Sequence, residues 1–172
     1  MARNYFELFE LPARFNIDLK ELAARHRERI RVWHPDRYAQ GSSEERRRAV
    51  AVSADLNDGL KVLRDPVSRA RHLLALRGIS TDEDTDTSMD AGFLMEQMAW
   101  RERLEEGVAR PEEVAALIAL VAQSRDAKES ELARLLDSGQ TTDLDRAREL
   151  VRELQFLERF TRELDCAVTE AL

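Results

Sequence analysis

The sequence has few of the residues that cross-link a chain or interrupt its helices. A single cysteine, Cys166, permits no disulfide within the chain and no cysteine-based zinc site. Only 4 prolines and 6 glycines occur in 172 residues, while alanine, leucine, glutamate and arginine dominate, which predicts an all-α fold. The sequence contains neither an apolar run of membrane-spanning length nor a signal-peptide pattern at its start. We therefore expect a cytoplasmic protein that binds no membrane.

Charge is unevenly distributed along the chain. Residues 1–78 contain 16 Lys and Arg against 11 Asp and Glu, whereas the remaining residues contain 11 against 23. A basic first half and an acidic second half predict two surfaces with different partners. The net charge of −7 argues against nucleic acid as the main partner.

The tripeptide His34-Pro35-Asp36 separates two stretches with helical periodicity. Pro35 cannot donate a backbone hydrogen bond, and its ring pushes the preceding residue out of the right-handed helical region. The first helix must therefore end near Trp33, and residues 37–41 should form a polar loop. A histidine and an aspartate are thus left at the tip of a helical hairpin. The positions that set the period are Leu19, Leu22, His26, Ile30 and Trp33 before the tripeptide, and Val50, Ala54, Asn57 with its neighbour Leu56, Leu60 and Leu63 after it.

The helix before the tripeptide carries a face of nearly one sign. Only Glu21 and Glu28 offset its positive charges. A charged helix face is ordinarily only a solvated surface. Here nearly all the charge is positive, which fits an electrostatic docking surface at least as well as a solvated face. The cations of this face are Lys20, Arg25, Arg27, Arg29 and Arg31.

Helix-start signals place the other elements of the first half. Capping-box patterns at 18–21 and 42–45 open the two helices of the hairpin. Asp65-Pro66, a cap followed by proline at the first helical position, opens a further helix that ends before Gly78. These signals predict a hairpin flanked by short helices.

Residues 79–88 are polar and acidic, and they should form a linker between two domains. We therefore predict one domain over 1–78 and a second over 89–172. Short connections between the helices of the second domain favour an antiparallel three-helix bundle. Its predicted helices cover about 90–108, 111–137, and 142 to nearly the C-terminus.

The first helix of the predicted bundle carries two apolar stripes. Phe93, Trp100, Leu104 and Val108 share one side and form the core stripe, at about 100° per residue. A second set lies a third of a turn or more away: Leu94, Met95 and Met98, continued by Glu102 and Glu106. If the core face of the helix were simply wide, that width would account for Leu94, but not for the two methionines. Adaptable methionines with an acidic rim are more typical of a partner-binding strip.

Phe156 stands apart from the apolar stripe of the last helix. The stripe is expected to consist of Leu150, Leu154, Leu157 and Leu164. We therefore consider Phe156 a candidate for the same binding surface, with Phe160 as the competing core aromatic.

Several segments together resemble a J domain, and others narrow the resemblance to the HscB family of iron–sulfur cluster co-chaperones. The J-domain segments are Tyr5–Phe9, the basic helix, His34–Arg37, Leu56–Asp58, Val62–Pro66 and Arg69-Ala70. The narrowing segments are Ala70–Leu74, Arg77-Gly78 and above all Phe93–Met98. The resemblance extends over the chain from about Asn4.

The resemblance implies a co-chaperone with no enzymatic activity of its own. The J domain would dock on a DnaK-type chaperone, HscA, through His34, Pro35 and Asp36, and would stimulate its ATP hydrolysis. The bundle would bind the iron–sulfur scaffold protein IscU through the predicted strip and Phe156. The chain lacks the cysteine-rich zinc extension of eukaryotic relatives, which implies no metal or cofactor of its own. Ala99 departs from the family, which often has an acidic residue there.

Three other interpretations remain open from the residues. A J-domain co-chaperone could serve a different client through the same bundle. An enzyme could use His34 and Asp36 as an acid–base pair, with His26 as a further candidate, although His26 lies on the apolar stripe and fits a packing role better. A purely structural helical adaptor would use the tripeptide only as a turn.

Overall fold

The computed structural model describes residues 3–81, 90–107, 110–138 and 144–170, and every regular element among them is helical. The chain divides into two compact units, residues 1–78 and 79–172. The predicted all-α fold is confirmed. Of the features expected from the sequence, Val108, the acidic residues 82–88 and the cap near 142 lie outside the described residues.

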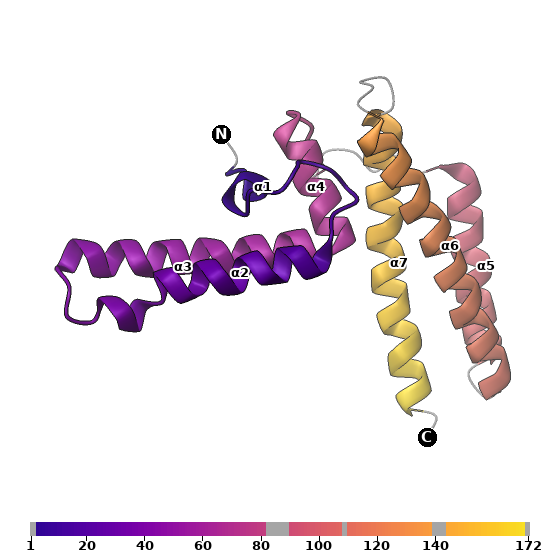
Figure 1. Ribbon diagram of the computed structural model, residues 1–172. Coiled ribbons are helices and arrows are strands. Elements are labelled where there is room, and N and C mark those ends of the chain that lie inside the picture. Colours follow the sequence, from indigo (N-terminus) through magenta and orange to yellow (C-terminus); the bar gives the residue numbers. More distant parts are fainter. Residues whose placement is uncertain (1–2, 82–89, 108–109, 139–143, 171–172) are drawn as a thin grey trace. The chain divides into compact units, whose positions relative to one another are not determined.

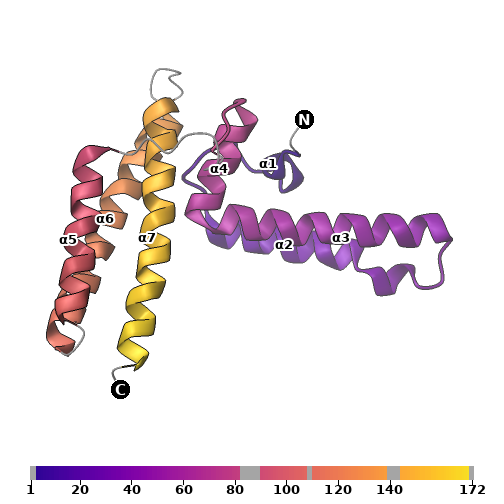
Figure 2. The same ribbon diagram turned by 180° about the vertical axis from the view of Figure 1, so that it is seen from behind.

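The first unit is built on a long helical hairpin. Helices α2 and α3 run side by side in opposite directions, and η1, a single 3₁₀ turn, lies at the end where they are joined (Figure 1). The view from behind shows α1 and α4 on one side of this hairpin (Figure 2). The elements are α1 (Tyr5–Leu8), α2 (Leu19–Trp33), η1 (Pro35–Tyr38), α3 (Ser43–Arg64) and α4 (Pro66–Leu76).

Side-chain caps define where these helices begin. The carboxylate of Asp18 accepts hydrogen bonds from two backbone N–H groups at the start of α2, and Asp65 does the same for one at the start of α4. Ser42 and Glu45 form a complete capping box at the start of α3. The pattern at 18–21 is only half of such a box, because Glu21 pairs with Arg25.

Gly59 explains how α1 approaches the hairpin so closely. A Cβ atom at this position would lie 2.9 Å from a ring atom of Phe9 and 2.9 Å from a ring atom of Tyr5. Glycine costs roughly 1 kcal/mol of helix propensity relative to alanine in a helix interior. The close packing of two aromatic rings against α3 accounts for its presence here. The buried core that these rings join includes Phe6, Leu22, Leu56, Leu63, Leu73 and Leu74.

His72 ties α1 to α4. Its Nε2 accepts a hydrogen bond from the backbone N–H of Tyr5 at 3.2 Å, and its ring packs on the rings of Tyr5 and Phe6. An imidazole nitrogen can accept only when it carries no proton. Burial lowers the pKa of His72 from its ordinary value, because it disfavours the charged ring. The folded unit therefore favours the neutral form of His72.

The stability of the first unit should fall in mild acid. The unfolded chain binds a proton at His72 near its ordinary pKa of 6.5, whereas the folded chain binds it only at lower pH. The free energy of unfolding is therefore highest above that value and decreases below it, by up to about 1.4 kcal/mol per pH unit, until the folded pKa is reached. Thermal unfolding from pH 7.5 to 5 should show this decrease, and His72→Gln should reduce it. His26→Gln is the matched control, and an equal pH dependence in both variants would contradict the assignment.

The second unit is an antiparallel three-helix bundle. It consists of α5 (Ala91–Gly107), α6 (Pro111–Asp137) and α7 (Leu144–Glu170), which lie side by side in both views (Figures 1 and 2). Apolar side chains from all three helices fill its centre. They include Phe93, Trp100, Leu117, Leu132, Leu136, Leu150, Leu154 and Phe160.

Two details differ from expectation. Residues 35–38 form a 3₁₀ turn where a polar loop was expected to begin, because the fixed backbone angle of Pro35 suits the first position of a helical turn. Thr81 is buried, although it lies in the polar segment that was expected to form a linker.

Candidate functional site

The tripeptide His34-Pro35-Asp36, which we call the HPD tip, joins α2 to η1. His34 has extended backbone angles (φ −60°, ψ 128°), as expected for a residue before proline. Its Nδ1 accepts a hydrogen bond from the backbone N–H of Asp36 at 3.3 Å and lies 3.5 Å from the Asp36 carboxylate. The neutral ring therefore carries its proton on Nε2. The side chains of His34 and Asp36 are 51% and 90% exposed, so both are available to a partner.

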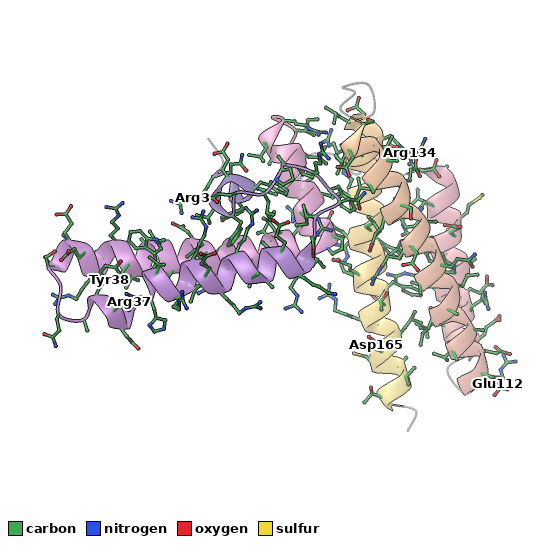
Figure 3. The ribbon with its side chains drawn as sticks, viewed as in Figure 1. Arg3, Arg37, Tyr38, Glu112, Arg134 and Asp165 are labelled. Carbon is green, nitrogen blue, oxygen red and sulfur yellow. The ribbon has the colours of Figure 1, made fainter. Side chains whose placement is uncertain are left out.

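Arg37 stabilises the end of α2 behind the tip. In a continuous helix the carbonyl of Arg31 would accept from the backbone N–H four residues on, but that residue is Pro35 and has no N–H. The guanidinium of Arg37 supplies the missing donor, with Nη1 3.1 Å from the carbonyl oxygen of Arg31. Figure 3 labels Arg37 and its neighbour Tyr38 at this end of the hairpin. Sequence reasoning missed this role, although an arginine directly after the tripeptide was visible.

Two of the predicted docking arginines have structural partners within their own unit. Arg25 donates to the carbonyl oxygens of Phe9 (2.8 Å) and Glu10 (2.5 Å), and Arg29 pairs with the Glu10 carboxylate at 2.5 Å. The sequence predicted that only Glu21 and Glu28 offset the positive charge of this face. That expectation is corrected, because Glu10, which pairs with Arg29, comes from the segment after α1. Arg27 and Arg31 are exposed.

His26 packs within the hairpin, as its place on the apolar stripe predicted. Its Nε2 lies 3.1 Å from the side-chain oxygen of Asn57 on α3, and its ring is 6.2 Å from that of Phe9. The half-buried ring therefore helps to join α2 and α3.

A second exposed site lies on α5. Leu94, Met95 and Met98, which we call the α5 strip, are 44%, 75% and 71% exposed. Glu102 and Glu106 are also exposed further along the helix. The opposite side of α5 is buried through Phe93 and Trp100. Three large apolar side chains on one exposed helix face are typical of a protein interaction site.

The expectation that Phe156 lies outside the core stripe is wrong. Its side chain is only 8% exposed, and its ring packs edge-on against Phe93 and stacks on Phe160, with ring centres 5.7 and 5.8 Å apart. The apolar stripe of α7 is therefore wide enough to include both aromatics. The guanidinium of Arg101 on α5 lies 5.9 Å from the centre of the Phe156 ring. Phe156 thus supports α5 from within the bundle.

Charged groups inside the bundle also support α5. Lys128 pairs with Glu153, and its Nζ lies 4.4 Å from the centre of the Phe93 ring. Arg146 bonds to Glu153 at 3.0 Å and to Glu131 at 3.1 Å. We call these four ionised residues the charge cluster. Sequence reasoning missed it because two of its contacts, Lys128–Glu153 and Arg146–Glu131, join positions on different helices.

The charge balance of the cluster keeps its arginine ionised. Burial alone would lower the pKa of Arg146, but hydrogen bonds to Glu131 and Glu149 and the charges of Glu153 and Glu131 raise it above its ordinary value. Glu153, at 2% exposed, is the most buried member and contacts both cations.

Replacing Glu153 with alanine should strongly destabilise the second unit. The variant leaves Lys128 without its carboxylate partner and removes one of the three carboxylates around Arg146. Removing one partner of a fully buried ion pair costs about 3–5 kcal/mol, and the partial exposure of both cations places the expected loss at the lower end of that range. Chemical denaturation followed by circular dichroism measures this loss. Glu149→Ala is the matched control, since Glu149 also bonds to Arg146 but is 46% exposed and should cost less than about 1 kcal/mol. Equal losses in the two variants would contradict a buried cluster.

A helical hairpin with an exposed HPD tip, followed by a helical C-terminal domain, defines a J-domain co-chaperone. Comparison with known proteins agrees with this class. Residues 89–165 match the family model described as the HSCB C-terminal oligomerisation domain. Among curated relatives, the Co-chaperone protein HscB homolog of Shewanella amazonensis is 42% identical, over 95% of this chain and 96% of the relative. That of Burkholderia mallei is 40% identical, over 96% and 94%. The chain belongs to the HscB family of co-chaperones.

Solved structures of the family share the fold. Chaperone HscB from Vibrio cholerae matches with a TM-score of 0.86 and 32% identity, over 99% of this chain and all of the other. Human co-chaperone HscB matches with a TM-score of 0.88 and 27% identity, over 95% of this chain and 81% of the other. No helix within the described ranges is long and apolar enough to cross a membrane.

Proposed function

We propose that this co-chaperone couples an iron–sulfur scaffold protein of the IscU type to a DnaK-type chaperone of the HscA type. The observation that carries the proposal is the presence of two exposed sites on two separate units. The HPD tip belongs to the first unit, and the α5 strip belongs to the second. In this proposal one chain holds both partners.

The first unit would act on the chaperone. His34, Pro35 and Asp36 contact the ATPase domain, where they offer the Nε2–H group of His34 and the carboxylate of Asp36. Arg27 and Arg31 steer the approach of an acidic partner surface, since exposed like charges on one helix accelerate encounter with the opposite charge. Arg25 and Arg29 act indirectly, by holding the segment after α1 in place. ATP hydrolysis takes place in the chaperone, so this chain is an activator without catalytic chemistry of its own.

The second unit would bind the scaffold. Leu94, Met95 and Met98 form the apolar centre of the interface, and Glu102 and Glu106 form its charged rim. Unbranched methionines can adapt to an irregular apolar surface. Phe156 contributes from beneath, by fixing Phe93 and hence the turn of α5 that presents the strip.

The proposal is tested by the steady-state ATPase rate of an HscA-type chaperone. The rate is measured with this protein alone, with an IscU-type scaffold alone, and with both. Stimulation by the protein alone, and a rate with both that exceeds the sum of the separate effects, is the expected result. Stimulation without enhancement by the scaffold would instead identify a J-domain co-chaperone that serves another client.

A further inference from the structure

The peptide group before His34 is held by a side chain from the opposite helix. In an uninterrupted helix the carbonyl of Trp33 would accept from the backbone N–H of Arg37. That N–H donates instead to the carbonyl of His34 at 3.0 Å, as the tighter 3₁₀ turn requires. The carbonyl of Trp33 accepts a hydrogen bond from the hydroxyl of Ser53 on α3 in place of the Arg37 N–H, with Oγ 2.6 Å from the carbonyl oxygen.

The surroundings of this bond restrict movement. Ser53 is only 8% exposed, so water can scarcely replace its hydroxyl. The ring of Trp33 stacks on that of Tyr38 in η1, with ring centres 5.8 Å apart and planes at 10°. The guanidinium of Arg48 on α3 lies 5.3 Å from the centre of the same indole ring. The carbonyl and the ring of Trp33 are thus both fixed by neighbouring elements.

We infer that Ser53 is a positioning residue for the HPD tip. The carbonyl of Trp33 and the nitrogen of His34 belong to one planar peptide group. A hydrogen bond to that carbonyl therefore fixes the plane from which His34 projects. Without the hydroxyl, the peptide group can rotate, and a smaller fraction of chains presents His34 and Asp36 in the geometry that the partner binds. The apparent affinity then falls in proportion to this fraction. The consequence for chaperone activation rests on the proposed function, whereas the placement of His34 can be measured without a chaperone.

The first readout is NMR of the free full-length chain. The Asp36 amide, which donates to Nδ1 of His34, reports the geometry of the tip through its hydrogen exchange. Ser53→Ala should accelerate this exchange by about fivefold, the factor expected when a hydrogen bond of ordinary strength is lost. Ser53→Thr and Ser53→Val have nearly the same shape, but only threonine keeps a hydroxyl. The threonine variant should therefore exchange more slowly than the valine variant.

The second readout is the stimulation curve of the chaperone ATPase. Ser53→Ala and Ser53→Val should measurably raise the concentration for half-maximal stimulation, by no more than about fivefold, and leave the maximal rate unchanged, whereas Ser53→Thr should stay near the wild type. A merely structural role would lower the melting temperature without separating threonine from valine in either readout, and that result would overturn the inference. If the wild-type chain does not stimulate the chaperone, the proposed function fails, and the NMR comparison alone decides the role of Ser53.

Discussion

Replacing His34 with glutamine is expected to abolish most of the stimulation of the chaperone ATPase. Glutamine can still accept the hydrogen bond from the Asp36 amide, so the turn itself should survive. The variant loses the aromatic ring and the Nε2–H group that the exposed tip offers to a partner. Loss of a central interface contact costs about 2 kcal/mol or more, which corresponds to a decrease of roughly 30-fold in stimulation at subsaturating concentration.

The matched control for this variant is His26→Gln. His26 lies on the same helix, but its ring bonds to Asn57 within the hairpin. The His26→Gln variant should therefore leave stimulation near the wild-type level. Wild-type stimulation by the His34 variant would mean that the tripeptide serves only as a turn, as in a structural adaptor.

Changing Leu94, Met95 and Met98 together to alanine is expected to abolish binding to an IscU-type scaffold. The three side chains are exposed in the free protein, so their truncation should change the free energy of unfolding by only a few tenths of a kcal/mol each. In a complex they would be the buried apolar anchors, each contributing about 1 kcal/mol or more. Their combined loss should weaken binding by 100-fold or more, which isothermal titration calorimetry can measure.

A second alanine variant controls for the loss of exposed apolar surface in general. Leu120 on α6 and Val168 on α7 are 40% and 37% exposed, and neither belongs to the α5 strip. Changing both to alanine should leave scaffold affinity unchanged. A triple variant that binds as well as the wild type, with its helix content retained, would refute the assignment of the strip.

Local signals explain which parts of the fold could be predicted from the sequence. Asp18, Ser42 and Asp65 cap helices through backbone groups two or three residues away, so the pattern and the contact occupy the same short segment. Pro35 likewise ends α2 through its own ring. The exposure of Met95 and Met98 followed from helical periodicity alone, because their side chains face away from the core stripe.

Contacts between distant segments explain what could not be predicted. The contacts of Arg25 and Arg29 with Phe9 and Glu10 could not be predicted, because these partners lie in a segment whose path the helix pattern does not define. Phe156 looked peripheral because the width of a buried helix face depends on the neighbouring helices, here through Phe93.

The charge cluster could not be predicted for the same reason. Lys128 and Glu153 are 25 positions apart, and neither carries a local sign of burial. Ser53 likewise reaches a carbonyl 20 positions away, at the end of the facing helix.

The central claim is that one chain carries both partners, and a mixing experiment tests it most directly. The His34→Gln variant keeps the α5 strip, and the triple-alanine variant keeps the HPD tip. The two are combined with an HscA-type chaperone and an IscU-type scaffold, at the total concentration used for the wild type. The mixture should show only the scaffold-independent stimulation of the triple-alanine variant, because no single chain in it can bind both partners. Full scaffold-enhanced stimulation by the mixture would contradict the account.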